Sequence, residues 1–318
     1  HHHRGREDGC LTMTAPAIVL DCDPGIDDAF AIFCALRHTE LLALTTVDGN
    51  VDVENTTRNA RYLLDLAGAP SVPVHRGASR PIRSTSQHAR QVHGPSGLGL
   101  VDVPDVAAPE AATSAVDALL ALSERDGLMV VATGPLTNLA LAIEQDRSFA
   151  DRVGPVHWMG GAIDAGNVTA TAEFNSWHDA DAVEVCLRAG LELTTYGLDL
   201  TRQVRMGTHH TAALRRKRSR TAILAADLLD YYEAHGTQDG LGQPMHDPCA
   251  VLGVTHPQLF SYERAPIVVS TQAETRGQTT IASADDSSAG SITLARSVDA
   301  DAVITEIMRA AEHPLANG

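Results

Sequence analysis

Four carboxylates lie within eight residues of one another near the start of the chain, at Asp21, Asp23, Asp27 and Asp28. The Pro24-Gly25 pair between them predicts a turn. Crowded carboxylates raise one another's pKa unless a cation compensates their charge. The string therefore predicts a hard divalent cation, Ca²⁺ or Mg²⁺, held by oxygen ligands. A plainer interpretation also fits, with Asp27 as a helix cap, Asp28 as a first-turn acid and the other two as loop residues.

The elements on either side of the four acids indicate how their side chains would come together. The apolar residues 17–20 predict a buried parallel strand, and the apolar residues 29–36 predict a buried helix. Because side chains alternate along a strand, Asp21 and Asp23 are expected on the same face. The second pair of acids falls in the first turn of the helix, where the helix dipole stabilises negative charge.

Strand-like and helical runs alternate along the rest of the chain. The expected strands are residues 41–47, 71–74, 128–132, 155–158, 191–195, 265–270 and 291–295, and the expected helices are residues 53–67, 114–123, 136–145, 221–234, 247–253 and 299–311. This alternation predicts an α/β fold with a mostly parallel central sheet flanked by helices, open and Rossmann-like. Sites in such sheets lie at the carboxyl ends of the strands.

The domain organisation is expected to be simple. Residues 1–12, which begin with three histidines, resemble the remnant of an expression tag, and Met13 is the expected natural start. Residues 13–318 contain no internal repeat or linker, which indicates one domain. Residues 76–112 are rich in Gly, Pro, Ser and His and are too long for a plain connection, so we expect an active-site loop there.

Composition restricts the partners of the chain. The net charge of −16 argues against nucleic acid or an anionic membrane as a general partner. The basic run Arg215–Arg220 is the exception, and we expect it on a solvated helix face or turn. No uncharged apolar run reaches the length of a membrane-spanning helix. The scattered cysteines after the tag-like residues predict buried thiols in a reducing compartment, the cytoplasm: Cys22, Cys34, Cys186 and Cys249.

Further motifs follow the expected strands in order. They are Val47-Asp48-Gly49-Asn50, Val131-Ala-Thr133-Gly-Pro-Leu-Thr-Asn138, Met159-Gly-Gly161 with Gly166-Asn167 and Ala172-Glu173-Phe174-Asn175, and Met245-His246-Asp247-Pro248-Cys249-Ala250. Together with the acid string, these motifs resemble the calcium-dependent nucleoside hydrolase family over residues 16–312. Inosine-uridine preferring and pyrimidine ribonucleoside hydrolases belong to this family, which cleaves ribonucleosides to ribose and free base. The resemblance implies a ribonucleoside as substrate and a role in nucleoside salvage.

The resemblance implies a Ca²⁺ site. Asp23, Asp28 and Asp247 would bind the ion through carboxylates and Thr133 through its backbone carbonyl, with water and the ribose 2′- and 3′-hydroxyls completing the shell. Calcium accepts six to eight oxygen ligands in loose geometry, which suits this mixture. Without the resemblance, Asp247 is also a good helix cap before Pro248, and both roles are compatible.

The resemblance also implies how the N-glycosidic bond breaks, through an oxocarbenium-like transition state. A Ca²⁺-bound water, whose pKa is lowered by the metal, would lose its proton to Asp23 as general base. His246 would protonate or orient the leaving base, and His93 matches a second family histidine. Met159 would pack beside the sugar, and Phe174 would line the base pocket. The ribose hydroxyls would be bound by Asp27, Asn50, Asn167, Glu173 and Asn175.

Three features stay open at this stage. Tyr231 and Tyr232 stand where family members often carry aromatics, but His235 and Gln238 nearby depart from that pattern, so the preferred base is not set. Asp21 matches the family and is expected to support the metal ligands. The resemblance also implies a homodimer or homotetramer.

Two other classes of function were weighed. A haloacid dehalogenase-type phosphatase also places Asp-x-Asp after its first strand and binds Mg²⁺, but it requires Thr or Val where this chain has Gly25. It also requires a later lysine, and the only lysine here is Lys217, inside the basic run. A protein of the same fold that acts on a modified nucleoside, or that only binds nucleosides, is the second alternative. The intact acid set argues against binding alone.

Overall fold

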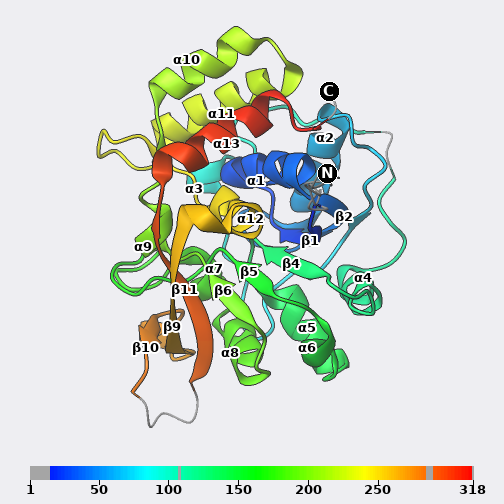
Figure 1. Ribbon diagram of the computed structural model, residues 1–318, viewed down its shortest axis with the longest axis vertical. Helices are drawn as coiled ribbons and strands as arrows, with labels where there is room; N and C mark the ends of the chain where they lie inside the picture. The colour runs from blue at the N-terminus through cyan, green and yellow to red at the C-terminus, as the bar shows by residue number, and fades with distance from the viewer. Residues whose placement is uncertain (1–14, 107–108, 284–288, 317–318) are drawn as a thin grey trace, which may run out of the picture.

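The computed structural model describes residues 15–106, 109–283 and 289–316. The described residues form one nine-stranded sheet in the order β10-β9-β11-β6-β5-β4-β1-β2-β3 and a separate two-stranded sheet, β7-β8 (Figure 1). The strands are β1 Ala17–Cys22, β2 Glu40–Thr46, β3 Val74–His75, β4 Met129–Ala132, β5 Val156–Trp158, β6 Leu193–Thr195, β7 Arg205–Met206, β8 Gln243–Pro244, β9 Phe260–Val269, β10 Thr279–Ile281 and β11 Gly290–Val298.

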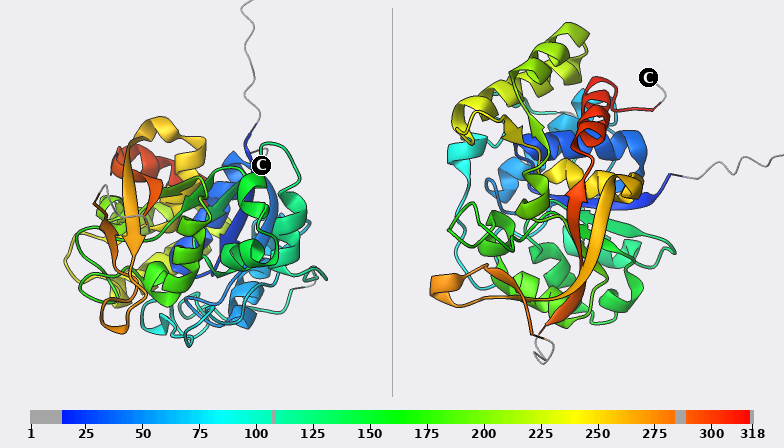
Figure 2. Two further views of the ribbon diagram at one scale, coloured as in Figure 1. Left: turned by 90° about the horizontal axis from the view of Figure 1, so that it is seen from below. Right: turned by 60° about the vertical axis from the view of Figure 1, so that its left-hand side comes forward.

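The sheet is parallel from β3 to β6. Strand β11 continues it in parallel beside β6, whereas β9 and β10 are antiparallel additions at that edge, where β9 and β11 run side by side (Figure 2). The chain winds outward from β1 to β3 and then returns to β4 on the other side of β1. This reversal makes β1 and β4 the switch point at which open α/β sheets bind their ligands. The predicted mostly parallel, Rossmann-like sheet is confirmed.

Helices cover both faces of the sheet (Figure 1). On one side, the sheet packs against α1 Ile26–His38, α2 Val53–Leu66 and α12 Asp247–Thr255, and α10 Thr208–Lys217, α11 Arg220–His235 and α13 Ala300–Glu312 pack outside these helices. The other face packs against α4 Ala115–Leu122, α5 Thr137–Gln145, α6 Phe149–Arg152 and α8 Ala180–Arg188. Short helices and 3₁₀ turns connect these layers: α3 Arg90–His93, α7 Phe174–His178, α9 Leu198–Thr201, η1 Pro257–Leu259 and η2 Ala273–Thr275.

Helix α1 is the central helix of its layer. It begins directly after β1, and every residue from Ile26 to Ala35 is buried, because its apolar residues face the sheet on one side and α12 and α13 on the other. Asp27 and Asp28 occupy its first turn. The burial of this helix therefore carries two carboxylates into the interior, beside the end of β1.

The expected strands and helices are present, with shifted ends. Strand β3 comprises Val74–His75, whereas the expected strand was residues 71–74. It begins only after Pro73, because Pro73 has no N–H to donate. The carbonyl of Pro73 accepts a hydrogen bond from the N–H of Leu44. Sequence reasoning named no helix at α8 or α10 and no β7-β8 pair. The expected tag remnant, residues 1–12, and Met13 lie outside the described residues.

Three expectations from composition have structural counterparts. Cys22, Cys34, Cys186 and Cys249 are buried free thiols. The basic run lies at the end of α10 and the start of α11, where Arg215 pairs with two aspartates of α11, Asp227 and Asp230, so the solvated-helix interpretation is confirmed. Within the described residues, no helix combines the length and the hydropathy needed to cross a membrane.

Candidate active site

A cleft opens at the carboxyl ends of β1 and β4. Its volume is about 220 Å³, and it is lined by Asp27, Asn50, Ala89, Gln91, Val92, His93, Thr133, Met159, Asn167, Val168, Glu173, Phe174, Asn175, Tyr232, His246 and Asp247. Of the residues predicted from sequence, only Asp23 and Asp28 are absent from the lining. Both are fully buried beneath it.

Three carboxylates meet at the bottom of the cleft, at the N-termini of two packed helices. Asp27 and Asp28 come from α1 and Asp247 from α12, and one oxygen of each lies within 4.8 Å of the others. Both helix dipoles direct partial positive charge toward these groups. With Asp23 they form what we call the carboxylate floor.

Asp23 is held by the loop that follows β2. Its Oδ2 accepts a hydrogen bond of 2.7 Å from the backbone N–H of Asn50, whereas its Oδ1 is buried and has no hydrogen-bond partner among the described residues. The loop approaches so closely that a Cβ on Gly49 would lie 2.0 Å from Oδ2. Only glycine fits there. The geometry fixes one oxygen of Asp23 and leaves the other available.

The carboxylate floor is electrostatically crowded. Burial, and next the charge of Asp28, raises the pKa of Asp23 well above its usual range and that of Asp27 to about 7. The pKa of Asp247 is raised well above its usual range by burial and then by the charge of Asp27. A cation bound among these groups would remove this repulsion.

The donor set suits a hard cation. The carboxylate floor offers only oxygen atoms, and the partnerless Oδ1 of Asp23 is the kind of buried polar atom that a bound ion satisfies. Thr133, at the end of β4, donates from Oγ1 to Asp28 at 2.8 Å, and its carbonyl accepts from Asn175 Nδ2 at 2.7 Å. The hydroxyl of Thr133 therefore contacts the floor and its carbonyl contacts Asn175, whereas the sequence analysis assigned a role only to the carbonyl.

The segment expected to bind ribose follows β5. Glu173 caps α7 and accepts from the backbone N–H groups of Gly161, Asn175 and Ser176. Asn167 uses Oδ1 to accept from the N–H of Phe174, at 2.9 Å, which leaves its amide N–H₂ free for a ligand. The carboxylate of Glu173 therefore holds the loop through three hydrogen bonds, whereas the amide N–H₂ of Asn167 remains available to a ligand.

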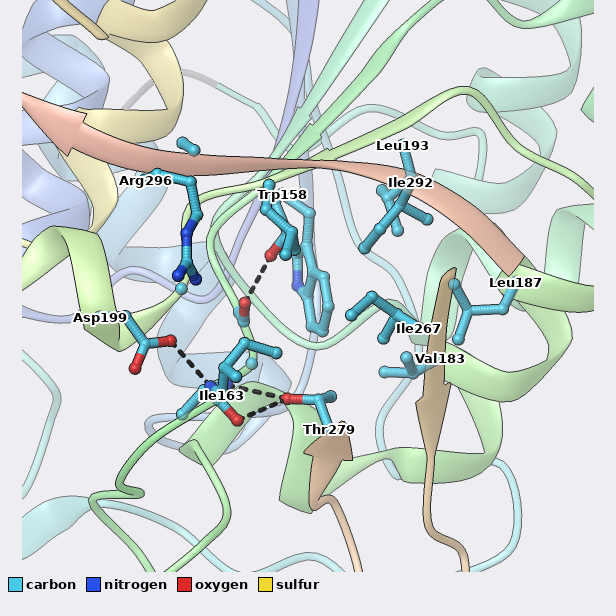
Figure 3. Close-up of a pocket in the computed structure, with 17 residues that line it drawn as sticks. Trp158, Ile163, Val183, Leu187, Leu193, Asp199, Ile267, Thr279, Ile292 and Arg296 are labelled. Carbon is cyan, nitrogen blue, oxygen red and sulfur yellow. Dashed lines mark hydrogen bonds between the residues drawn. The ribbon is translucent and has the colours of Figure 1, made fainter. Parts of the chain in front are cut away.

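A brace from α9 and β10 holds this same loop. Asp199 accepts from the N–H groups of Ile163 and Asp164, and Thr279 Oγ1 bonds both the N–H and the carbonyl of Ala162 (Figure 3). The apolar crevice behind these residues has a volume of only about 20 Å³, room for about one water molecule. It is a packing gap in the brace and not a second ligand site.

His93, Tyr232 and His246 form another part of the cleft lining, which we call the histidine side. His93, in α3, accepts the N–H of Ile26 on Nδ1 at 3.0 Å, so its proton is on Nε2. Burial lowers the pKa of His93 to about 4 and that of His246 to about 3. Both rings are therefore neutral near pH 7. Thr201 Oγ1 lies 2.7 Å from His246 Nδ1 and orients that ring.

Comparison with known proteins decides the family. The model of the inosine-uridine preferring nucleoside hydrolase family matches residues 18–305. The chain belongs to this family. Uridine nucleosidase 1 from Arabidopsis thaliana is 38% identical over 270 residues, 82% of this chain and 80% of the relative. The inosine-uridine preferring nucleoside hydrolase of Leishmania major is 37% identical over 276 residues, 83% of this chain and 87% of the relative.

Solved structures agree. The purine-preferring ribonucleoside hydrolase from Gardnerella vaginalis has a TM-score of 0.89 and 31% identity, covering 95% of this chain and 100% of that one. The predictions of a nucleoside hydrolase fold and of a ribonucleoside hydrolase are confirmed. A haloacid dehalogenase-type phosphatase is thereby excluded.

Sequence reasoning about this nucleoside hydrolase left some lining residues unnamed. Ala89, Gln91 and Val92 come from α3 and the loop before it, inside the long segment 76–112 that was expected to reach the site. Val168 follows Asn167 directly. Of the two tyrosine candidates, Tyr232 lines the cleft, whereas Tyr231 stacks on His235 with ring centroids 3.9 Å apart.

Two supporting aspartates lie behind the site. Asp21 accepts from Thr45 Oγ1 at 2.6 Å and from Asn138 Nδ2 at 2.7 Å, which joins the ends of β1 and β2 to the first turn of α5. Asp48 lies between two histidines, His178 at 3.1 Å and His88 at 3.0 Å, and connects the β2 loop to the long loop. The first had been expected to play a supporting role, and the second had no assigned role.

Proposed function

We propose that this nucleoside hydrolase, as one domain over residues 13–318, cleaves the N-glycosidic bond of ribonucleosides with Asp23 as general base and Ca²⁺ as cofactor. The observation that carries the proposal is the carboxylate floor, above all the buried, partnerless Oδ1 of Asp23. Burial without a partner is costly for a carboxylate oxygen, so the arrangement is best explained by a role with a bound ion and a reacting proton.

The metal ligands we propose are Asp23, Asp28 and Asp247, with Thr133 through its carbonyl. Asp27 lies in the same group of carboxylates, so one of its oxygens would lie near the ion as well. Calcium suits this set better than magnesium because it accepts more oxygen ligands in a less regular arrangement. When bound, the ion would lower the pKa of the attacking water and help to orient the sugar.

Asp23 then has two separate tasks for its two oxygens. The backbone of Asn50 holds Oδ2, which fixes the orientation of the carboxylate. Oδ1 is left to accept the proton of the water that attacks the anomeric carbon, as a general base requires. As the C–N bond breaks, positive charge develops on the ribosyl ring, and the surrounding carboxylates stabilise it.

The ribose hydroxyls would be bound by groups at the rim of the floor. Asn50 donates from Nδ2 to Asp28 and to the carbonyl of Asp23, at 3.1 Å each, which leaves its Oδ1 as an acceptor. Asn167 offers its amide N–H₂, as described above. The other members of the proposed set are Asp27, Glu173, Asn175, Met159 beside the sugar and Phe174 at the base.

The leaving base would meet the histidine side. Because His93 and His246 are neutral, each would stabilise the departing base by a hydrogen bond from a ring N–H and not by a positive charge. The relatives' names include both uridine and purine preferences. We therefore propose no preference between purine and pyrimidine bases.

Release of free ribose tests the proposal. Uridine, cytidine, inosine, adenosine and guanosine would be assayed with Ca²⁺, after chelation and after Ca²⁺ is restored. Turnover of at least one substrate, lost on chelation and regained with Ca²⁺, is the expected result. Undiminished turnover after complete chelation would contradict the metal role. Absence of all turnover in folded, metal-loaded protein would favour the alternative, a modified nucleoside or binding alone.

Several further properties stay predictions. A homodimer or homotetramer is expected, and light scattering after size-exclusion chromatography measures it. A cytoplasmic location and a role in nucleoside salvage are expected as well, and neither nucleic acid nor membrane is an expected partner.

A further inference from the structure

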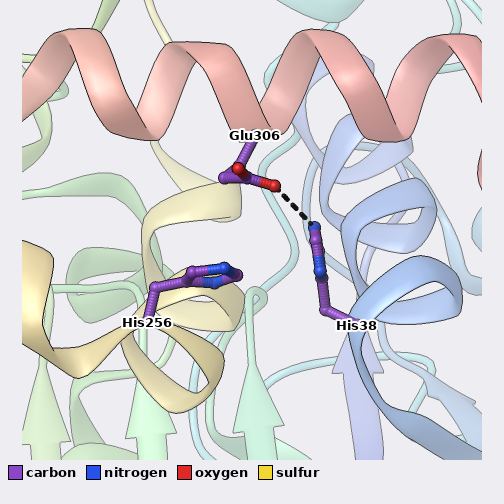
Figure 4. A group of neighbouring side chains, drawn as sticks. All are labelled: His38, His256 and Glu306. Carbon is purple, nitrogen blue, oxygen red and sulfur yellow. Dashed lines mark ion pairs between the residues drawn. The ribbon is translucent and has the colours of Figure 1, made fainter.

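A second group of possible metal ligands lies at the far ends of the helices that carry the carboxylate floor. His38 is the last residue of α1, His256 follows α12 directly, and Glu306 lies in α13 (Figure 4). One ligand atom from each lies within 4.8 Å of the other two. At about 1.5 Å per residue, His38 is roughly 15 Å along α1 from Asp28, so this group is separate from the active site.

Two facing atoms in the group have no hydrogen bond. His38 Nε2 and Glu306 Oε2 are buried, 3.4 Å apart, and neither has a hydrogen-bond partner among the described residues. Two ligands bound to one Zn²⁺ at 2.0–2.1 Å in a tetrahedron are separated by about 3.4 Å. The distance is thus too long for a good hydrogen bond but matches one edge of a zinc site.

Hydrogen bonds prepare the third ligand. Thr255 Oγ1 lies 2.8 Å from His256 Nδ1 and donates to the carbonyl of Val251 at 3.4 Å. When His256 Nδ1 donates to Thr255, Nε2 carries the free lone pair that a metal ion needs. A histidine ligand usually has its second ring nitrogen bonded in this way.

Glu306, Arg37 and Arg309 are the charged groups around His38. Arg309 bonds Glu306 through Oε1 and leaves Oε2 toward His38, while Arg37 bonds the carbonyl of His313. The C-terminal ends of α1 and α12, where the helix dipoles are negative, meet here.

We propose that His38, His256 and Glu306 form a second metal site, which binds Zn²⁺ or a divalent ion of the same class. Two imidazoles and one carboxylate are a common zinc-ligand set, and imidazole favours such ions over Ca²⁺. Because the ligands come from α1, α12 and α13, the ion connects three helices that already pack together. It holds α1 and α12 at the ends opposite to Asp28 and Asp247.

Metal binding by the full chain tests the proposal without any activity assay. Because His1, His2 and His3 also bind transition metals, all proteins carry serine at these positions. The metal-free parent is saturated with Ca²⁺ and titrated with Zn²⁺ against a chromophoric chelator. We expect one Zn²⁺ per chain, and at least about 100-fold weaker binding in His38→Gln and His256→Gln, because losing even a ligand's partner costs about 10–100-fold.

Two further variants control the experiment. Thr255→Val removes the hydrogen bonds of the Thr255 hydroxyl to His256 and to the carbonyl of Val251 and should weaken Zn²⁺ binding by about 10–100-fold. His313→Gln changes an exposed histidine near the end of α13 and should alter the affinity by less than about 2-fold, as surface changes do. Equal affinity in the parent and both ligand variants, or no Zn²⁺ binding by the parent, would overturn the proposal.

A spectroscopic measurement covers the case of a variant that does not fold. Co²⁺ bound by the parent protein should give the intense visible absorption of a tetrahedral site, displaced by Zn²⁺. Only weak octahedral absorption would overturn the proposal without reference to any variant. Failure of the proposed catalytic function would leave both metal readouts unchanged, so the two proposals fail separately.

Discussion

The carboxylate floor and the histidine side belong to one cleft but are built differently. The floor comes from the end of β1 and the first turns of two buried helices, and its acids are almost completely buried. The histidine side comes from the four-residue helix α3 in a long loop, from α11, and from the residue before α12. The carboxylate floor is built from the centre of the fold, and the histidine side mostly from loops and helix ends.

The difference assigns separate parts of the chemistry to separate structures. Proton transfer and ribose binding require atoms held precisely, which buried strand ends and helix termini provide. In the proposed function, recognition of the base would depend on the loop and the neutral rings of the histidine side, and loops change more easily in evolution than a core does. Relatives with different base preferences in their names can therefore share one floor.

The largest expected effect concerns the ribose hydroxyls that the floor and its rim bind. A site with polar groups directed at a hydroxyl rejects the analogue that lacks it by as much as about 10⁴–10⁵-fold. If uridine is a substrate, it should therefore be hydrolysed far faster than 2′-deoxyuridine. If it is not, inosine should be hydrolysed far faster than 2′-deoxyinosine. The measurement is kcat/KM for each pair. Comparable values would disprove the assignment of the ribose-binding residues.

The next effect comes from the proposed base. Asp23→Asn keeps the shape of the side chain and its bond from Asn50 but cannot take a proton, so kcat should fall by about 10²–10⁴-fold. Asp21→Asn is the matched control, because its carboxylate only accepts from Thr45 and Asn138, and the loss should be nearer 10-fold. A variant of Asp23 that keeps more than about a tenth of the activity would contradict the general-base role.

The carboxylate floor could be predicted from the sequence more completely than the histidine side. Strand β1, helix α1 and the positions of Asp23, Asp28, Thr133 and Asp247 follow from apolar runs, turn residues and motifs that are local in the chain. The sequence does not predict that Asp27 also lies within 4.8 Å of Asp247, because this approach depends on how α1 packs on α12. Such packing has no local signal.

The base side was predicted less completely for a related reason. The length and composition of residues 76–112 indicated an active-site loop, but which of its residues reach the cleft depends on its hydrogen bonds, such as that between His93 and the N–H of Ile26. Tyr231 and Tyr232 are adjacent and equivalent by sequence, and only the rotation of α11 separates them. The group formed by His38, His256 and Glu306 joins residues far apart in the chain, and no sequence motif indicates it.

A smaller effect is expected on the histidine side. His246→Ala removes a neutral hydrogen-bond donor, and such a bond contributes about 0.5–1.5 kcal/mol, so kcat should fall by no more than about 10-fold. Substrates with the poorest leaving bases should lose most. The comparison is kcat across the five nucleosides for wild type and variant. An equal loss for every substrate would show that His246 positions the loop and does not contact the departing base.

The smallest effect should come from the brace behind the ribose loop. Asp199→Asn keeps an oxygen that can accept from Ile163 or Asp164 but removes the charge that strengthens both bonds. Because the brace touches no reacting atom, the segment that carries Asn167 should become less well placed, and KM should rise by a few-fold, about 1 kcal/mol or less, with kcat nearly unchanged. Steady-state kinetics separates the two constants. A fall in kcat with unchanged KM would mean that the brace supports the transition state, and the division between a precisely held floor and adaptable surroundings would need to be redrawn to include α9.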